Sequence, residues 1–221
     1  MYPQARSALA RTARALAAEG LVLATAGNLS VREGEHLLVS PTGAQLGALE
    51  PEHVAVVDRD GALVDGPFAA TSEMALHLAL YRRPDVGAVV HAHAPIASAL
   101  ACVQGLREIP VVHYGMLELG GSVRVAPYAT YGTQELADLV AAAMEGRQAA
   151  LMASHGAVSV GPDLDGAIAA MRLLEWSCGV YWRASAIGTA HVLSEAELEG
   201  ARAAIDGARY GALQPAAPPT R

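Results

Sequence analysis

Apolar residues recur along the chain with two different spacings, and these predict two kinds of element. Long stretches in which apolar residues return every three or four positions predict amphipathic helices. The helices are expected at residues 4–19, 72–82, 94–104, 133–145, 163–187 and 194–209. Short apolar runs between them predict strands, expected at residues 29–32, 36–40, 54–58, 62–65, 87–92, 109–113, 122–126 and 149–154.

Polar residues punctuate this pattern where elements begin and end. Thr133 and Asp163 stand where a helix N-cap is needed, and Ser194 and Glu197 have the spacing of a capping box. Short strands joined by tight turns alternate with helices, which predicts an α/β fold. We expect one three-layer domain over residues 1–212, with a largely antiparallel central sheet between helices. Residues 213–221 are rich in Pro and Ala and predict a flexible C-terminal tail.

Composition and charge exclude several partners. The 221-residue chain is 52% hydrophobic and carries a net charge of −7. Its Lys and Arg residues are scattered singly, so nucleic acid is not expected as a partner. No apolar run approaches the ~20 residues that span a bilayer. Cys102 and Cys178 lie far apart outside any Cys-x-x-Cys pattern, which fits a reducing, cytoplasmic location.

Two histidines stand one residue apart inside the apolar run at 87–92 and just beyond it. Because residues i and i+2 of a strand point to the same face, His91 and His93 are predicted to present two imidazoles side by side. Neutral imidazole suits Zn²⁺, and a catalytic zinc commonly takes three protein ligands. The pair therefore predicts part of a zinc site.

A third ligand and a carboxylate are predicted from two other segments. His155 follows the apolar strand at 149–154 and precedes Gly156, which lets the chain turn close to a site. Glu73 stands in the first turn of the helix at 72–82. Its position allows a role as metal ligand, as general base, or as both.

Other catalytic motifs fit this sequence less well. Glu73 and His77 lack the first histidine of His-Glu-x-x-His, which disfavours a zinc peptidase. A cupin also uses a His-x-His pair, but on an all-β barrel, and the predicted helices argue against it. The chain has no Gly-x-Ser-x-Gly elbow for a serine hydrolase.

Small polar residues gather at three places that could together bind a phosphate. Asn28 and the turn of Thr42 and Gly43 lie where strands meet loops, and Thr71 and Ser72 precede a helix, whose free N–H groups favour an anion. Each cluster alone is also an ordinary turn or cap. The phosphate site therefore requires the clusters to converge in the fold.

The order of these motifs along the chain resembles the class II aldolase/adducin family. The resemblance extends from Ala24 to Tyr210 and is most specific for members that cleave L-fuculose 1-phosphate. It rests on residues 27–32, 41–43, 72–73, 91–93, 126–130 and 155–156.

The resemblance implies a role for each matching residue. His91, His93 and His155 correspond to the family's zinc ligands, with one Zn²⁺ per chain. Glu73 corresponds to a residue that alternates between metal ligand and catalytic acid/base. The residues at the family's substrate-phosphate positions are Asn28, Thr42, Gly43, Thr71 and Ser72.

Three tyrosines complete the implied active site. Tyr114 resembles the tyrosine that protonates the aldehyde oxygen, and Tyr210 resembles the C-terminal tyrosine that closes over the site. Tyr131 replaces a phenylalanine of the family. Because such enzymes are homotetramers with active sites at subunit interfaces, Tyr114 is expected from a neighbouring chain.

The implied reaction is cleavage of a ketose 1-phosphate to dihydroxyacetone phosphate and a small aldehyde. Family epimerases have aspartate at position 73, dehydratases have glutamate at position 115 instead, and adducin-like members have lost the metal histidines. These differences favour the aldolase over an epimerase or a non-catalytic interaction domain. A decarboxylase acting on phosphorylated 3-oxo acids shares the metal residues and remains an alternative.

Overall fold

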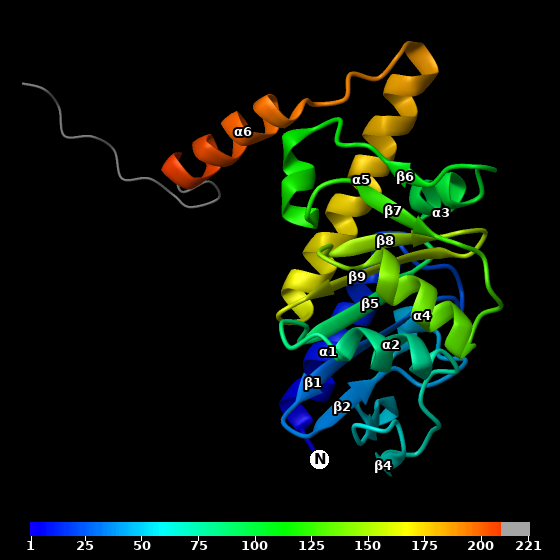
Figure 1. The fold of residues 1–221 in the computed structure, drawn as a ribbon. Helices are drawn as coiled ribbons and strands as arrows, with labels where there is room; N and C mark the ends of the chain where they lie inside the picture. The colour runs from blue at the N-terminus through cyan, green and yellow to red at the C-terminus, as the bar shows by residue number, and fades with distance from the viewer. Residues whose placement is uncertain (209–221) are drawn as a thin grey trace, which may run out of the picture.

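The computed structural model describes residues 1–208. A nine-stranded sheet forms the middle layer of this part of the chain (Figure 1). The strand order is β4-β3-β2-β1-β5-β9-β8-β7-β6, and every neighbouring pair is antiparallel except β7 and β8. The strands are β1 (Asn28–Glu33), β2 (His36–Val39), β3 (Ala55–Val57), β4 (Leu63–Asp65), β5 (Ala88–Ala92), β6 (Glu108–Ile109), β7 (Val123–Ala126), β8 (Ala149–Met152) and β9 (Gly156–Gly161). The predicted largely antiparallel sheet is confirmed.

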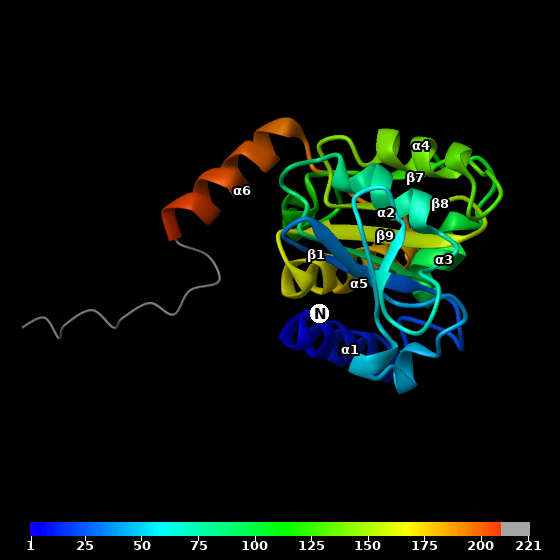
Figure 2. The same ribbon diagram turned by 90° about the horizontal axis from the view of Figure 1, so that it is seen from below.

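Helices cover both faces of the sheet and complete the three predicted layers. Figure 2 shows α2 and α4 on one face and α1 and α5 on the other. Each face has its own hydrophobic core. The α-helices are α1 (Pro3–Ala18), α2 (Met74–Tyr81), α3 (Pro95–Ala101), α4 (Gln134–Ala143), α5 (Leu164–Ile187) and α6 (Glu195–Ala208). The short 3-10 helices are η1 (Leu46–Ala48), η2 (Pro51–His53) and η3 (Tyr114–Leu119).

The predicted caps close the helices as expected. The Thr133 hydroxyl accepts the N–H of Leu136, and the Asp163 carboxylate accepts the N–H of Gly166. Ser194 and Glu197 bond each other's backbone N–H groups, which is the predicted capping box. All six predicted α-helices lie within two residues of their expected ends, apart from the C-terminal end of α3.

The predicted strands differ from the structure at two places. The strand β9 was missed, because Gly156–Gly161 has only two large apolar residues between its glycines. Every residue of β9 is buried, since it lies between β5 and β8 and packs against α5. The run at 109–113 forms only the two-residue strand β6, and its last residue, His113, instead caps η3.

The last described helix extends away from the body of the domain. α6 projects from the end of α5 in both ribbon views and contacts η3 (Figures 1 and 2). The predicted tail at 213–221, the domain boundary at residue 212 and Tyr210 lie outside the described residues. None of the helices within residues 1–208 is both long enough and apolar enough to cross a membrane.

Candidate active site

The two histidines of the His-x-His pair lie at the end of β5, in the centre of the sheet. Their rings point the same way, with centroids 5.0 Å apart and Nε2 atoms 3.2 Å apart. Asn28 on β1 is the register partner of His91. The side-by-side arrangement predicted from the alternation of a strand is thus confirmed.

A tight hairpin brings the third histidine to the pair. His155 lies between β8 and β9, and its ring centroid is 4.9 Å from that of His91. Ser154 adopts a left-handed conformation with φ of 53°, which turns the chain into the site. A Cβ atom on Gly156 would lie 2.7 Å from the Ala92 carbonyl oxygen, so the close approach requires glycine.

Glu73 reaches the histidines from the helical layer that contains α2 and places its carboxylate against their rings. It is the N-cap residue of α2, one position before the helix, and not in its first turn as predicted. Its Oε2 atom lies 3.1 Å from His91 Nε2 and accepts the Asn28 amide at 2.8 Å. Burial raises the pKa of Glu73, but His91 and the Asn28 amide outweigh burial and lower it to about 2.

The histidine rings are electrostatically prepared for a cation. Burial, together with the charge of His91, lowers the pKa of His93 to about 4 and also lowers that of His155. Both rings are therefore uncharged at neutral pH and have a lone pair to donate. Neutral imidazole and carboxylate are the donor types that zinc and similar divalent metals accept.

The donor atoms fit one divalent cation. The candidate ligand atoms of His91, His93 and His155 all lie within 4.8 Å of one another. His91 donates its Nδ1 hydrogen to the Ala157 carbonyl, so its Nε2 atom is the one that faces His93 Nε2 and Glu73 Oε2. Two imidazole nitrogens and a carboxylate oxygen this close together need a proton or a cation among them. Glu73 Oε1 is also buried beside them without a hydrogen-bond partner among the described residues.

The candidate phosphate-binding residues meet candidate metal ligands at one cavity. This cavity has a volume of about 290 Å³. Its lining includes all five residues from the three polar clusters, namely Asn28, Thr42, Gly43, Thr71 and Ser72. Glu73, His93 and His155 form another part of the same wall. The convergence that the phosphate site required is therefore present.

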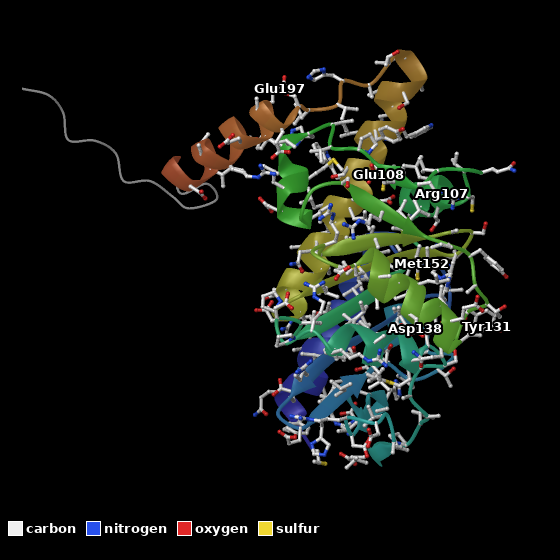
Figure 3. All side chains as sticks on the ribbon, viewed as in Figure 1. Arg107, Glu108, Tyr131, Asp138, Met152 and Glu197 are labelled. Atoms are coloured by element: carbon white, nitrogen blue, oxygen red, sulfur yellow. The ribbon has the colours of Figure 1, made fainter. Side chains whose placement is uncertain are left out.

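The remaining sequence predictions divide between the cavity and the surface. Tyr131 lines the cavity and lies before the N-terminal end of α4 (Figure 3). Tyr114 is 37% exposed, stacks on His113 and does not line the cavity of its own chain. Thr25 and Ala26 also line the cavity and were missed. Ala26 has no polar side chain, and the hydroxyl of Thr25, next to the Gly27–Asn28 cluster, was the signal that could have found it.

Comparison with known proteins gives one consistent family. The family model described as "Class II Aldolase and Adducin N-terminal domain" matches residues 7–182. The chain is 42% identical over 196 residues to a 5-methylthioribulose-1-phosphate/5-deoxyribulose-1-phosphate aldolase of Rhodospirillum rubrum, covering 88% of this chain and 87% of that protein.

An L-fuculose phosphate aldolase of Escherichia coli is 40% identical over 151 residues, or 67% of this chain and 69% of that protein. Among solved structures, an L-fuculose 1-phosphate aldolase superposes with a TM-score of 0.86 at 34% identity. That superposition covers 91% of this chain and 96% of the other.

Proposed function

Because this chain belongs to the class II aldolase and adducin family and is a carbon–carbon lyase, we propose that it cleaves a ketose 1-phosphate to dihydroxyacetone phosphate and a small aldehyde. The observation that carries this proposal is the single cavity lined by both the phosphate-type residues and the metal-type residues. The names of the relatives support substrates with a short or deoxygenated aldehyde portion, such as 5-deoxyribulose 1-phosphate.

We assign His91, His93 and His155 as ligands of one Zn²⁺ per chain. The charges in the cavity support a cation, because Glu73 is ionised and the lining described contains no lysine or arginine. A phosphate dianion would otherwise meet only a negative charge there. When bound, a divalent cation supplies stabilisation for the negative charge that develops on the ketose oxygens during cleavage.

The five small polar residues hold the phosphate end of the substrate. Thr42, Ser72 and Asn28 offer hydroxyl and amide donors, and backbone N–H groups near Gly43 add to them. Fixing the phosphate places the carbon–carbon bond to be broken next to Glu73. This orientation converts binding energy into alignment of the reacting atoms.

Two protons must move when the bond breaks. The hydroxyl on the aldehyde side loses its proton as its carbon becomes a carbonyl, and the carbon that becomes part of dihydroxyacetone phosphate gains one. We assign the second transfer to Glu73. Its Oε2 atom accepts the Asn28 amide, so Oε1, which has no hydrogen-bond partner among the described residues, is the oxygen that carries the proton.

The first transfer falls to Tyr114 of a neighbouring chain. Proton balance means that in cleavage this tyrosine accepts the hydroxyl proton and returns it to the aldehyde oxygen in the reverse direction. Its exposed position on η3 supports a contribution to another subunit's site. The proposal therefore includes the homotetramer expected from the family. It also includes a cytoplasmic location.

The test is release of dihydroxyacetone phosphate from a panel of ketose 1-phosphates by the purified, zinc-loaded chain. The panel contains 5-deoxyribulose 1-phosphate, 5-methylthioribulose 1-phosphate and L-fuculose 1-phosphate. We expect release from at least one, and loss of release after a chelator removes the metal. Release of carbon dioxide from a phosphorylated 3-oxo acid, without cleavage of any ketose phosphate, would replace the aldolase with a decarboxylase.

A further inference from the structure

A row of buried polar side chains runs from the floor of the cavity into the layer between β1 and α2. Ser30 and His77 are fully buried, and Tyr81 is 9% exposed. None of the three lines the cavity, and the proposed reaction uses none of them. A buried polar group destabilises the fold unless it is hydrogen-bonded, so we expect each polar atom in the row to have a hydrogen-bond partner.

The direction of each hydrogen bond in this row follows from the Glu73 carboxylate. An ionised carboxylate only accepts, so the Asn28 atom 2.8 Å from Oε2 must be the Nδ2 amide nitrogen. The Asn28 carbonyl oxygen then faces His77 Nε2 at 2.5 Å and can only accept. His77 therefore carries its hydrogen on Nε2.

The other end of the row fixes the opposite side of the His77 ring. With hydrogen on Nε2, Nδ1 holds a lone pair and accepts the Ser30 hydroxyl at 2.6 Å. Ser30 Oγ in turn accepts the Tyr81 hydroxyl at 2.8 Å. Burial lowers the pKa of His77 to about 3, so the ring is uncharged at neutral pH. Every hydrogen in the row thus points toward Glu73, an arrangement in which successive bonds strengthen one another.

We propose that His77 is a positioning residue for Glu73: Ser30 and Tyr81 hold it as the Nε2–H tautomer, and this tautomer fixes the Asn28 amide with its N–H groups toward Oε2. A reversed amide would place the Asn28 oxygen against the carboxylate. The fixed amide has a second N–H hydrogen, and Asn28 lines the cavity. One side chain can therefore contact both the substrate phosphate and the catalytic carboxylate.

This inference rests on the proposed acid/base role of Glu73, but its first test needs neither metal nor substrate. In the metal-free chain labelled with ¹⁵N in its histidine rings, NMR distinguishes protonated from unprotonated ring nitrogens. We expect His77 to show hydrogen on Nε2 and a bare Nδ1 at neutral pH. A hydrogen on Nδ1 would overturn the proposal, whatever the chain does to substrates.

The second test compares matched variants by exchange of solvent hydrogen into dihydroxyacetone phosphate, measured per metal-loaded site. His77→Met removes the donor at similar size, and His77→Gln keeps a terminal N–H group. We expect His77→Met to slow exchange by about 10-fold or more, and the KM for dihydroxyacetone phosphate to rise by a smaller factor. His77→Gln should recover most of the rate. Equal rates for all three proteins would overturn the proposal.

A serine pair separates positioning from simple loss of stability. Ser30 and Ser159 are both fully buried strand residues with bonded hydroxyls, but Ser159 bonds the Ala167 carbonyl outside the row. We expect both Ser30→Ala and Ser159→Ala to lower the Tm, and only Ser30→Ala to slow exchange. Equal slowing by both would overturn the proposal. Failure of the unchanged chain to cleave any ketose phosphate would instead reject the proposed function.

Discussion

The Nε2 atom of His155 lies 3.5 Å from Oε1 of Glu73, although the two residues are far apart in the sequence. His155 reaches this position from the β8–β9 hairpin, and Glu73 reaches it from the start of α2. The other carboxylate oxygen is held by Asn28. Oε2 is thus fixed by a hydrogen bond, and Oε1 remains available for proton transfer. The first prediction follows from this difference.

The E73Q variant should keep its metal and lose proton transfer. An amide at this position preserves the size of the side chain and its contacts with Asn28, but it cannot accept and return a proton at neutral pH. We expect exchange of solvent hydrogen into dihydroxyacetone phosphate to fall about 100-fold or more. The measurement is isotope exchange followed by NMR, with metal content determined on the same sample. Exchange at the unchanged rate would refute Glu73 as the base.

Ser72→Ala should weaken substrate binding without altering the fold. Ser72 is exposed and lines the cavity, so its hydroxyl is free to bond a phosphate oxygen. Loss of one bond to a charged group costs about 1.5 kcal/mol or more, so we expect the KM for the ketose phosphate to rise about 10-fold. The kcat should change little, because the same bond is made in the ground state and the transition state.

The control for this variant is Ser7→Ala, which removes an exposed hydroxyl on α1 outside the active-site cavity. It should leave the KM unchanged. A Ser72→Ala variant with the KM of the unchanged chain would remove this residue from the phosphate site.

Gly156→Ala should damage the metal site through sterics alone. The added Cβ would lie 2.7 Å from the Ala92 carbonyl oxygen and 3.2 Å from Cδ2 of His93, so β5 and β9 must separate. We expect a loss of about 1–3 kcal/mol in the free energy of unfolding and weaker metal binding. Denaturant unfolding and metal titration measure the two effects. Gly200→Ala on α6 meets no atom within 4 Å and should leave both unaffected or slightly raise stability.

Acidification should destabilise the metal-free protein between about pH 6.5 and pH 4. The pKa values of His77 and His93 are lowered to about 3 and about 4 in the folded chain. In the unfolded chain both return to about 6.5. Within this range the unfolded state binds more protons, so the free energy of unfolding falls as the pH falls.

Each of these histidines adds up to about 1.4 kcal/mol per pH unit to the slope of the free energy of unfolding in that range, and adds nothing to the slope at higher pH. Urea unfolding at several pH values measures the slope, and His77→Gln should reduce it. Stability that stays constant or rises on acidification from pH 6.5 to pH 4.5 would contradict the assigned ring charges.

The sequence predicted those parts of the structure that follow from local patterns. The helical spacing located α5, and the strand alternation placed His91 and His93 on one face. The sequence pattern did not predict β9. The residues of β9 are small, and the strand forms because it is buried against β5 and α5, which no local pattern shows.

The same distinction holds at the candidate site. The metal-type and phosphate-type residues carry chemical signatures and were predicted, whereas Ala26 lines the cavity without any. The orientation of His77 depends on Ser30 and Asn28, which lie on a strand distant in sequence. No spacing within α2 could have predicted those bonds.

The central claim, that three histidines hold one divalent ion, is tested most directly by metal analysis of the unchanged chain and of His93→Ala. Both proteins are stripped with a chelator, reloaded with Zn²⁺ and measured for zinc per chain, with circular dichroism to verify the fold. We predict one zinc per chain in the unchanged protein, and little or none in a folded His93→Ala variant. A folded variant that still retains one zinc per chain would contradict the claim.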